Sequence, residues 1–351
     1  MLSAVCLGES MAMLTPASEQ TLEQADVLQV GLGGAESNVA MGLAAMGIET
    51  HWIGRVGEDG FGSRILADLR AHSVGTTGVQ RDPLRHTGLY VKVPAQEGQS
   101  GSGSSMLYYR QDSAASAMGP DLLSDKVVAG LLADARLIHL SGITPALSPD
   151  CLELCRAVLS LPRNGRIISF DVNWRPALWH GKDHGVLQEL ANLADVVLVG
   201  SDEAEHAFGT GNEQELRALL PDPEVLVIKN EAFTAVALER SGAREEVPAL
   251  SVEVLEPVGA GDSFAAGYLS GMLLGLDLKA SLRRGHISAA CTLTVPGDRG
   301  PLPPAPLLTA LVGCSDADWG NTSVAAGEIR SPAVDNLASS TISPIPGKAD
   351  P

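Results

Sequence analysis

Short apolar runs that recur along the chain, separated by helix-like segments, are the feature that most restricts the fold of this sequence. The runs are Ala4–Leu7, Leu137–Leu140, Ile167–Phe170, Val196–Val199 and Val225–Ile228, each ending near Gly, Asn or Asp. The helix-patterned segments between the later runs are Cys151–Leu161, Val186–Leu193 and Glu213–Leu220. Continuously apolar strands that alternate with amphipathic helices predict an α/β fold, a doubly wound, mostly parallel sheet with helices on both faces. Such sheets bind ligands beyond the carboxyl ends of their strands, so the residues that follow each run are candidates for chemistry.

Length and charge limit the class of partner. The 351 residues, 45% of them hydrophobic, suffice for one large domain, and the net charge is −18. This acidity argues against nucleic acid and anionic membranes as partners, and an anionic ligand would need local cations. The five cysteines are scattered, the first residues lack a signal-peptide pattern, and no apolar run approaches the ~18 residues that span a bilayer. We therefore expect a cytoplasmic protein with reduced thiols and no membrane contact.

Two segments depart from the α/β rhythm. Gly88–Val93 and Met106–Arg110 read as two strands joined by a Gly/Ser-rich connection, which predicts a β-hairpin. A hairpin of this size needs support, so we interpret it as a lid over the ligand site, with an ordinary surface hairpin as the alternative. After Leu311 the chain becomes rich in Ser, Ala, Pro and Asn, and residues 313–351 are predicted to form a disordered tail.

The segment Glu256–Phe264 (EPVGAGDSF) is the most informative about chemistry. The small residues Gly259, Ala260 and Gly261 allow a tight turn whose N–H groups, with the start of the following helix, form an anion hole. Asp262 at the helix start is placed to accept a proton from an attacking hydroxyl. The alternative is that Asp262 only caps the helix.

Three motifs in order carry a family resemblance: GGAESNVA at Gly33–Ala40, GRVGEDGFG at Gly54–Gly62 and GAGDSF at Gly259–Phe264. With them the chain resembles the ribokinase-like (carbohydrate kinase) family, and neither a Walker A motif nor a protein-kinase glycine loop is present. The resemblance implies a kinase domain over residues 1–312 with a β lid from about 11–32 and 86–112. It also implies ATP with Mg²⁺ as the phosphoryl donor and Asp262 as the catalytic base.

Three further segments look like the 2-keto-3-deoxygluconate kinase branch of this family: LYYRQDSAAS at 107–116, SGITPALS at 141–148 and DVNWRPALW at 171–179. A sugar acid needs cations, and Arg110 and Arg175 follow predicted strands, so both are expected at the ligand edge. The resemblance assigns the substrate contacts to Gly34, Asn38, Tyr90, Tyr108, Arg110, Arg175 and Asp298. The expected reaction is phosphorylation of the terminal hydroxyl to the 6-phosphate. A neutral-sugar kinase of the fructokinase or ribokinase type, which would not need two arginines there, is the alternative.

The resemblance also implies a nucleotide side, with contacts from Asn173, Lys229, Gly259, Gly261 and His286 and an indirect, water-mediated Mg²⁺ contact from Glu203. Two departures from the family pattern affect it. The stretch Gly200–Glu203 lacks the usual Asn, and Lys229–Thr234 lacks both usual glycines while Glu231 adds a negative charge. These changes keep a third hypothesis open, a catalytically weak sugar-acid-binding sensor. An exposed edge of the lid would favour a homo-oligomer.

Overall fold

A nine-stranded sheet forms the centre of the molecule, for which we describe residues 2–17, 21–93 and 105–334 of a computed structural model. The strand order is β15-β14-β13-β12-β11-β10-β1-β4-β6, parallel from β6 to β13 and antiparallel at β14 and β15. The strands are β1 (Ser3–Leu7), β4 (Glu49–Ile53), β6 (Val74–Gly75), β10 (Leu137–Ser141), β11 (Ile167–Asp171), β12 (Val196–Gly200), β13 (Val225–Asn230), β14 (Thr234–Glu239) and β15 (Arg244–Pro248). The predicted doubly wound, mostly parallel sheet is confirmed.

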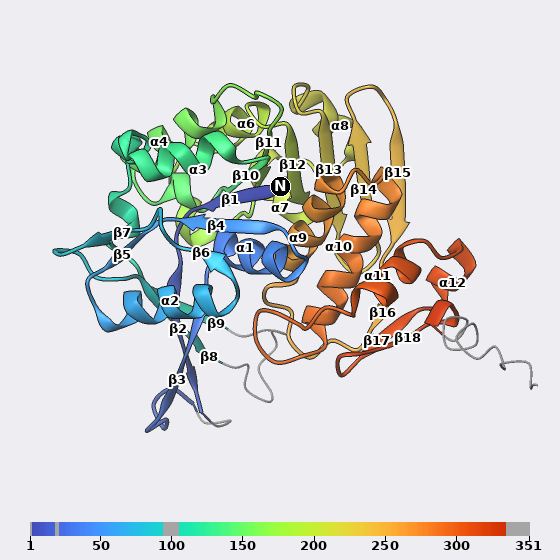
Figure 1. Ribbon diagram of the computed structural model, residues 1–351, viewed down its shortest axis with the longest axis horizontal. Helices are drawn as coiled ribbons and strands as arrows, with labels where there is room; N and C mark the ends of the chain where they lie inside the picture. The colour runs from blue at the N-terminus through green and yellow to red at the C-terminus, as the bar shows by residue number, and fades with distance from the viewer. Residues whose placement is uncertain (1, 18–20, 94–104, 335–351) are drawn as a thin grey trace, which may run out of the picture.

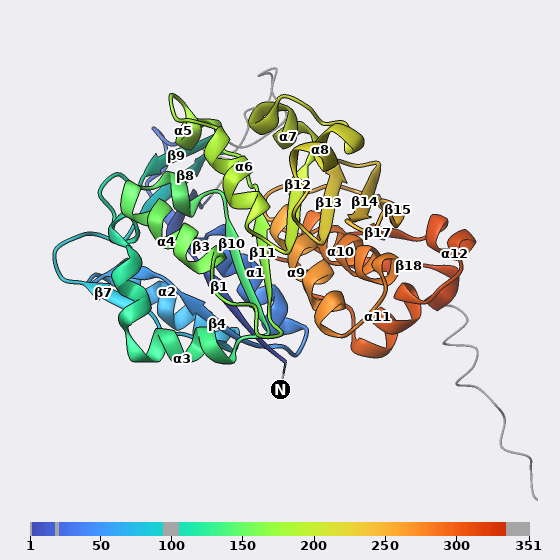
Figure 2. The same cartoon turned by 90° about the horizontal axis from the view of Figure 1, so that it is seen from above.

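Helices cover both faces of this sheet (Figures 1 and 2). One face carries α1 (Ala35–Ala45), α2 (Gly60–Ala71), α9 (Ala260–Leu273), α10 (Leu278–Leu293) and α11 (Ala305–Val312). The other carries α3 (Lys126–Asp134), α4 (Pro149–Leu159), α6 (Gly185–Asn192), α7 (Ser201–Phe208) and α8 (Glu213–Leu219). Alternate residues of each strand serve the two cores: in β12, Val196 and Leu198 join the first and Val197 and Val199 the second. Burial on both faces explains why the strands are continuously apolar.

A separate four-stranded sheet projects from the main body (Figure 1). Its order is β3-β2-β8-β9, formed by β2 (Met11–Pro16), β3 (Leu28–Gly33), β8 (Leu89–Val93) and β9 (Ser105–Tyr109). The hairpin predicted from the sequence is present as β8 and β9, and β2 pairs in parallel with β8 to support it. The connection between β8 and β9 lies outside the described residues.

The prediction of a disordered tail from residue 313 was wrong for residues 313–334. This stretch contains α12 (Asp316–Gly320), β17 (Ser323–Ala325) and β18 (Glu328–Arg330), and β17 pairs with β16 (Ser251–Val252). Trp319 is only 2% exposed and its indole N–H donates to the Pro248 carbonyl at 2.9 Å. A single buried aromatic and strand pairing fix a segment whose composition looks unstructured. Residues 335–351 lie outside the described residues.

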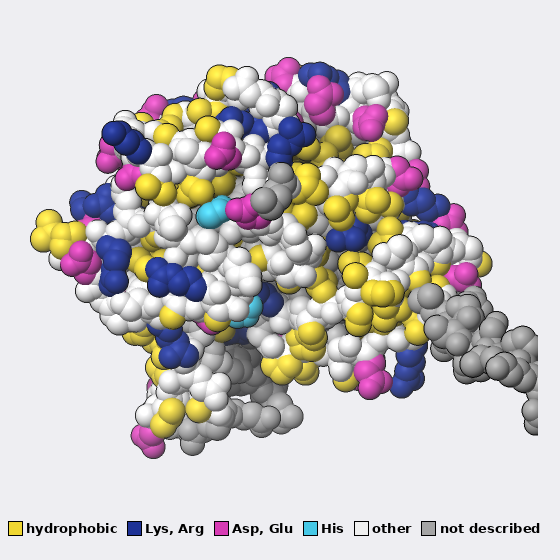
Figure 3. All heavy atoms as spheres, in the orientation of Figure 1, with side chains coloured by type: hydrophobic (Ala, Val, Ile, Leu, Met, Phe, Trp, Pro, Cys, Tyr) yellow, Lys and Arg dark blue, Asp and Glu magenta, His cyan; other side chains and the backbone are white. Residues whose placement is uncertain are grey.

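Two other features of the described chain bear on partners. None of its helices is long and apolar enough to cross a membrane, and all five cysteines are free thiols. On the face drawn in Figure 3, basic side chains are scattered among acidic and uncharged ones. The expectation that the protein does not bind nucleic acid stays a prediction.

Candidate active site

A cavity of about 440 Å³ lies where the carboxyl ends of the central strands meet the small sheet. Residues at or just after the carboxyl ends of β11, β12 and β13 line one wall, the starts of α1 and α9 form the floor, and β2, β8 and β9 contribute the opposite side. The predicted site residues among its lining are Gly34, Asn38, Tyr90, Tyr108, Arg110, Asn173, Arg175, Glu203, Lys229, Gly259, Gly261, Asp262 and Asp298. The fold therefore gathers residues from positions 34 to 298 of the chain into one cavity.

Asp262 lies in the first turn of α9 at the floor of this cavity. The Asn38 side-chain amide donates to its Oδ2 at 2.9 Å, and the Asn173 amide donates to its Oδ1 at 3.4 Å. Burial raises the pKa of Asp262 to about 7; the Asn38 hydrogen bond and the charge of Arg175 oppose this rise, and the Asp171 carboxylate adds to it. A carboxylate with this pKa is suited to accept a proton at neutral pH.

The turn before Asp262 is shaped for an anion. Gly259 has φ 82°, and a Cβ at this position would lie 2.1 Å from the Asp298 carbonyl oxygen, so only glycine fits. No side chain caps the start of α9, which leaves its first N–H groups without a side-chain acceptor. Ala260, the first residue of α9, does not line the cavity by its side chain. Free N–H groups at a helix start form a site for phosphate or another anion.

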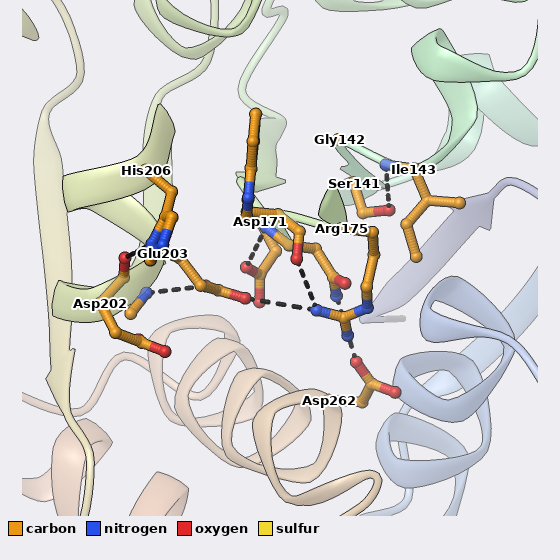
Figure 4. A network of polar contacts seen from close by, with 12 residues as sticks. Ser141, Gly142, Ile143, Asp171, Arg175, Asp202, Glu203, His206 and Asp262 are labelled. Carbon is orange, nitrogen blue, oxygen red and sulfur yellow. Dashed lines mark hydrogen bonds and ion pairs between the residues drawn. The ribbon is translucent and has the colours of Figure 1, made fainter. Parts of the chain in front are cut away.

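The two predicted arginines reach the same cavity, and each has a carboxylate partner. Arg110 forms an ion pair with the fully buried Glu9 and lies over the Tyr108 ring, 5.6 Å from its centroid. Arg175 pairs with Glu203 at 3.5 Å and remains 44% exposed. Figure 4 shows Arg175 between the carboxylates of Glu203 and Asp262. The guanidinium groups are thus held in place while Arg175 remains accessible to a ligand.

Lys229, a predicted nucleotide contact, forms an ion pair with Asp171, a residue that the sequence did not indicate. Lys229 Nζ lies 3.2 Å from the Asp171 carboxylate, and it is the nearest atom, at 3.7 Å, to a Cβ built at Gly261. Burial lowers the pKa of Lys229, but the Asp171 and Glu203 carboxylates outweigh burial and the net shift is upward. Lys229 therefore stays protonated beside the anion hole. Asp171, the last residue of β11, was not predicted.

The small sheet is tied to the anion-hole segment by polar contacts. The Tyr90 hydroxyl donates to Asp298 at 3.4 Å, and Lys92 Nζ lies 2.6 Å from Glu256 and 3.9 Å from Asp298. Burial raises the pKa of Asp298, and Lys92 opposes this rise. The Lys92–Glu256 pair, which the sequence did not predict, joins β8 to the residues that precede Gly259.

His286 does not line the cavity, and its burial contradicts the predicted nucleotide contact. Its ring lies in the core, 5.3 Å from the Phe264 ring and 6.3 Å from the Trp319 ring. Its Nε2 is 3.1 Å from the Val247 carbonyl oxygen, and burial lowers the pKa of His286 to about 4. A neutral His286 that donates to Val247 satisfies both contacts, which makes it a packing residue of α10.

Glu203 has a structural role at the position expected for a metal contact. As the third residue of α7 it accepts a hydrogen bond from the Gly200 N–H at 2.9 Å while it pairs with Arg175. No cluster of three His, Cys, Asp or Glu side chains suited to a metal is found within residues 2–17, 21–93 and 105–334. The indirect metal contact expected of Glu203 stays a prediction.

An open α/β sheet with a small second sheet beside its carboxyl edge, and a buried carboxylate next to a glycine-rich helix start, is an arrangement suited to the transfer of a phosphoryl group to a hydroxyl. Residues 1–305 match the model of the pfkB family carbohydrate kinases, and the chain belongs to this family. It is 35% identical to a 2-dehydro-3-deoxygluconokinase of Bacillus subtilis, covering 86% of this chain and 93% of that protein. It is 28% identical to a 2-dehydro-3-deoxygalactonokinase of Haloferax volcanii, covering 84% and 92%. A sugar kinase of Pyrococcus horikoshii in complex with ATP superposes with a TM-score of 0.72 at 26% identity, covering 85% and 94%.

Proposed function

We propose that this kinase transfers the γ-phosphoryl group of ATP to the terminal hydroxyl of 2-keto-3-deoxygluconate, also named 2-dehydro-3-deoxygluconate, and forms the 6-phosphate. The observation that carries the proposal is the presence of Arg110 and Arg175 in the same cavity as Asp262, in a chain of net charge −18. A neutral sugar offers these guanidinium groups no anionic partner, whereas a carboxylate does. The relatives named for acceptors of this kind support the same choice.

The geometry supports a direct transfer. Asp262 accepts the proton of the acceptor hydroxyl as its oxygen forms a bond to the γ-phosphorus, the bond to the bridging oxygen breaks, and ADP leaves. The N–H groups of Gly259–Gly261 and the Lys229 ammonium stabilise the charge on the transferring group. Mg²⁺, held near Glu203 through water, would neutralise charge on the phosphate oxygens.

The small sheet is proposed to act as a lid that also mediates assembly. Tyr90 and Tyr108 project from β8 and β9 into the cavity, and lid closure over the acceptor would exclude water and limit ATP hydrolysis. β9 is an edge strand with Leu107, Tyr108 and Tyr109 exposed. Pairing of this edge with a second copy would cover it, so a homo-oligomer through the lid is part of the proposal.

The test is an ADP-release assay with MgATP and four acceptors: 2-keto-3-deoxygluconate, its C4 epimer 2-keto-3-deoxygalactonate, fructose and ribose. We expect kcat/KM for at least one sugar acid to exceed that for the neutral sugars by about 10²-fold or more, because the carboxylate gains charge-assisted hydrogen bonds. Turnover with fructose or ribose alone would contradict the role of the arginines and support the neutral-sugar kinase. No turnover with tight sugar-acid binding would support the sensor.

The turn between β13 and β14 yields a prediction about ATP. Glu231 replaces a usual glycine there and adopts φ 48°, next to the 73% exposed Phe233. Replacement of Glu231 by Gly removes about 1–2 kcal/mol of backbone strain and one negative charge. We expect the KM for MgATP to fall several-fold and Tm to rise. Ala326→Gly is the matched control, because Ala326 has φ 47° in the β17–β18 turn. It should raise Tm without changing KM; an unchanged KM in Glu231→Gly would place the turn away from the nucleotide.

A further inference from the structure

A second cavity, of about 630 Å³, adjoins the active-site cavity and shares Tyr108, Arg110 and Arg175 with it. Its other walls come from β5 (Arg55–Gly57), from the segment after β7 (Gln80–Asp82), from the start of α4 and from α5 (Pro176–Trp179). Figure 2 shows α4 and α5 on the same side of the molecule as β8 and β9. We refer to this second cavity as the basic cleft.

The lining of the basic cleft is unusual for so acidic a chain. Five arginine and lysine side chains contribute to it against two aspartates: Arg55, Arg85, Arg110, Arg175 and Lys182 against Asp112 and Asp150. Across the whole chain the ratio is reversed, with 24 Lys and Arg against 42 Asp and Glu. The sign of the local charge therefore favours an anionic occupant.

The carboxylates that pair with Arg55, Arg85 and Arg110 are buried and do not line the cleft. Asp82, only 1% exposed, pairs with Arg55 at 2.9 Å and with Arg85 at 3.5 Å, so one carboxylate serves two guanidinium groups. Glu9, which pairs with Arg110, is fully buried as well. Arg85 keeps nearly half of its side chain exposed, and its guanidinium can bind a further anion.

Lys182 and Arg110 form a pair of like charges in the cleft. Lys182 Nζ donates to the Ala146 carbonyl and has no carboxylate within ion-pair distance among the described residues. Burial and the charge of Arg110 both lower the pKa of Lys182. Arg110 Nε is buried without a partner among the same residues. An anion between these groups would relieve the repulsion and supply the missing acceptor.

We propose that the basic cleft binds the phosphate group of a phosphorylated sugar acid whose carboxylate is held by Arg110 and Arg175. The phosphate binds Arg85 and Lys182, which with Arg55 line the part of the basic cleft that is not shared with the active-site cavity. A molecule bound in this way occupies the arginines that the acceptor needs and excludes the acceptor. The assignment of the carboxylate to Arg110 and Arg175 rests on the proposed function. The assignment of the phosphate rests on the side chains that line the basic cleft.

Calorimetric titration of the full-length protein tests the proposal with 6-phosphogluconate, gluconate and inorganic phosphate as probes. We expect 6-phosphogluconate to bind most tightly, because only this probe engages both groups of cations. Arg85→Gln and Lys182→Gln should each weaken its binding by about tenfold, from the loss of a charge-assisted hydrogen bond, and leave gluconate binding unchanged. Arg81→Gln is the matched control, since Arg81 is an exposed arginine of β7 that contacts Ser63 and does not line the cleft.

Kinetic inhibition provides the second readout. 6-Phosphogluconate should compete with the acceptor in the ADP-release assay, and Arg85→Gln and Lys182→Gln should raise its inhibition constant without changing uninhibited turnover. Unchanged binding in both variants would overturn the proposal and place the phosphate at the Gly259–Gly261 turn. Equal affinity for inorganic phosphate and 6-phosphogluconate would overturn the shared-arginine mode. Failure of the proposed function is separate, because it appears as no turnover with any sugar acid while the titration still decides the cleft.

Discussion

Replacement of Asp262 by Asn is expected to lower kcat by about 10²- to 10⁴-fold with little change in the affinity for the sugar acid. Asn is isosteric with Asp and can keep a contact with Asn38, but it cannot accept the hydroxyl proton. The measurement is steady-state ADP release, together with calorimetric binding of the sugar acid to separate binding from turnover. A variant that turned over like the unmodified enzyme would eliminate Asp262 as the base.

The pH dependence sharpens this prediction, since Asp262 has a pKa of about 7 against 3.8 for an ordinary aspartate. The base must be deprotonated, so kcat/KM should rise with pH through about 7 and then level off. A raised pKa in the folded state means that Asp262 contributes stability at low pH which is lost as the pH rises through about 7. Asp262→Asn removes this loss, so its Tm relative to the unmodified protein should be higher at pH 8 than at pH 5. A pH-independent difference in Tm would contradict the raised pKa.

Gly259→Ala is expected to lower kcat by about 10²- to 10³-fold, the cost of losing an anion-hole donor. The added Cβ would lie 2.1 Å from the Asp298 carbonyl oxygen at a residue with φ 82°, so the turn must move away from Asp298. Such a shift redirects the N–H groups that face the transferring phosphoryl group. We also expect Tm to fall, because a β-carbon at this φ and a backbone clash are both unfavourable.

Two matched variants separate the causes of this effect. Gly275 has φ 73° and a Cβ there would meet no atom within 4 Å, so Gly275→Ala measures the backbone cost alone. It should lower Tm and leave kcat unchanged. Gly261→Ala places its Cβ 3.7 Å from Lys229 Nζ, which is ordinary contact, so its effect on kcat should be smaller than that of Gly259→Ala. If Gly259→Ala lowered Tm as Gly275→Ala does but kept full kcat, the turn would not be the anion hole.

Two site residues that were not predicted from the sequence, like those that were, lie at the carboxyl ends of strands. Glu9 lies two residues after the end of β1, and Asp171 is the last residue of β11, so both lie at the carboxyl edge where ligands bind. A search of every strand end would have found them. The Lys92–Glu256 pair differs, because its partners are far apart in the chain and neither follows a strand of the main sheet. No local sequence pattern predicts such an ion pair.

Two predictions from the sequence were wrong: the nucleotide contact of His286 and the disorder of residues 313–334. The family resemblance implied a nucleotide contact from His286, but the ring of this α10 residue lies in the core against Phe264. Residues 313–334 carry few large apolar side chains, yet Trp319 and Val324 are buried against the main body. Whether a sparse segment folds depends on the surface that it meets, which is absent from its own composition.

By itself the sequence determined the doubly wound sheet, the position of Asp262 in a glycine-rich helix start and the presence of two arginines at the ends of predicted strands. These features are local: strand and helix periods, small residues at a turn, and residue types at strand ends are readable within a few positions. Only the tertiary structure determined which carboxylate pairs with each arginine, the burial that raises the pKa of Asp262, and the position of the basic cleft beside the active-site cavity. Those properties depend on burial and on charges brought together from distant parts of the chain, and both arise only when the elements pack.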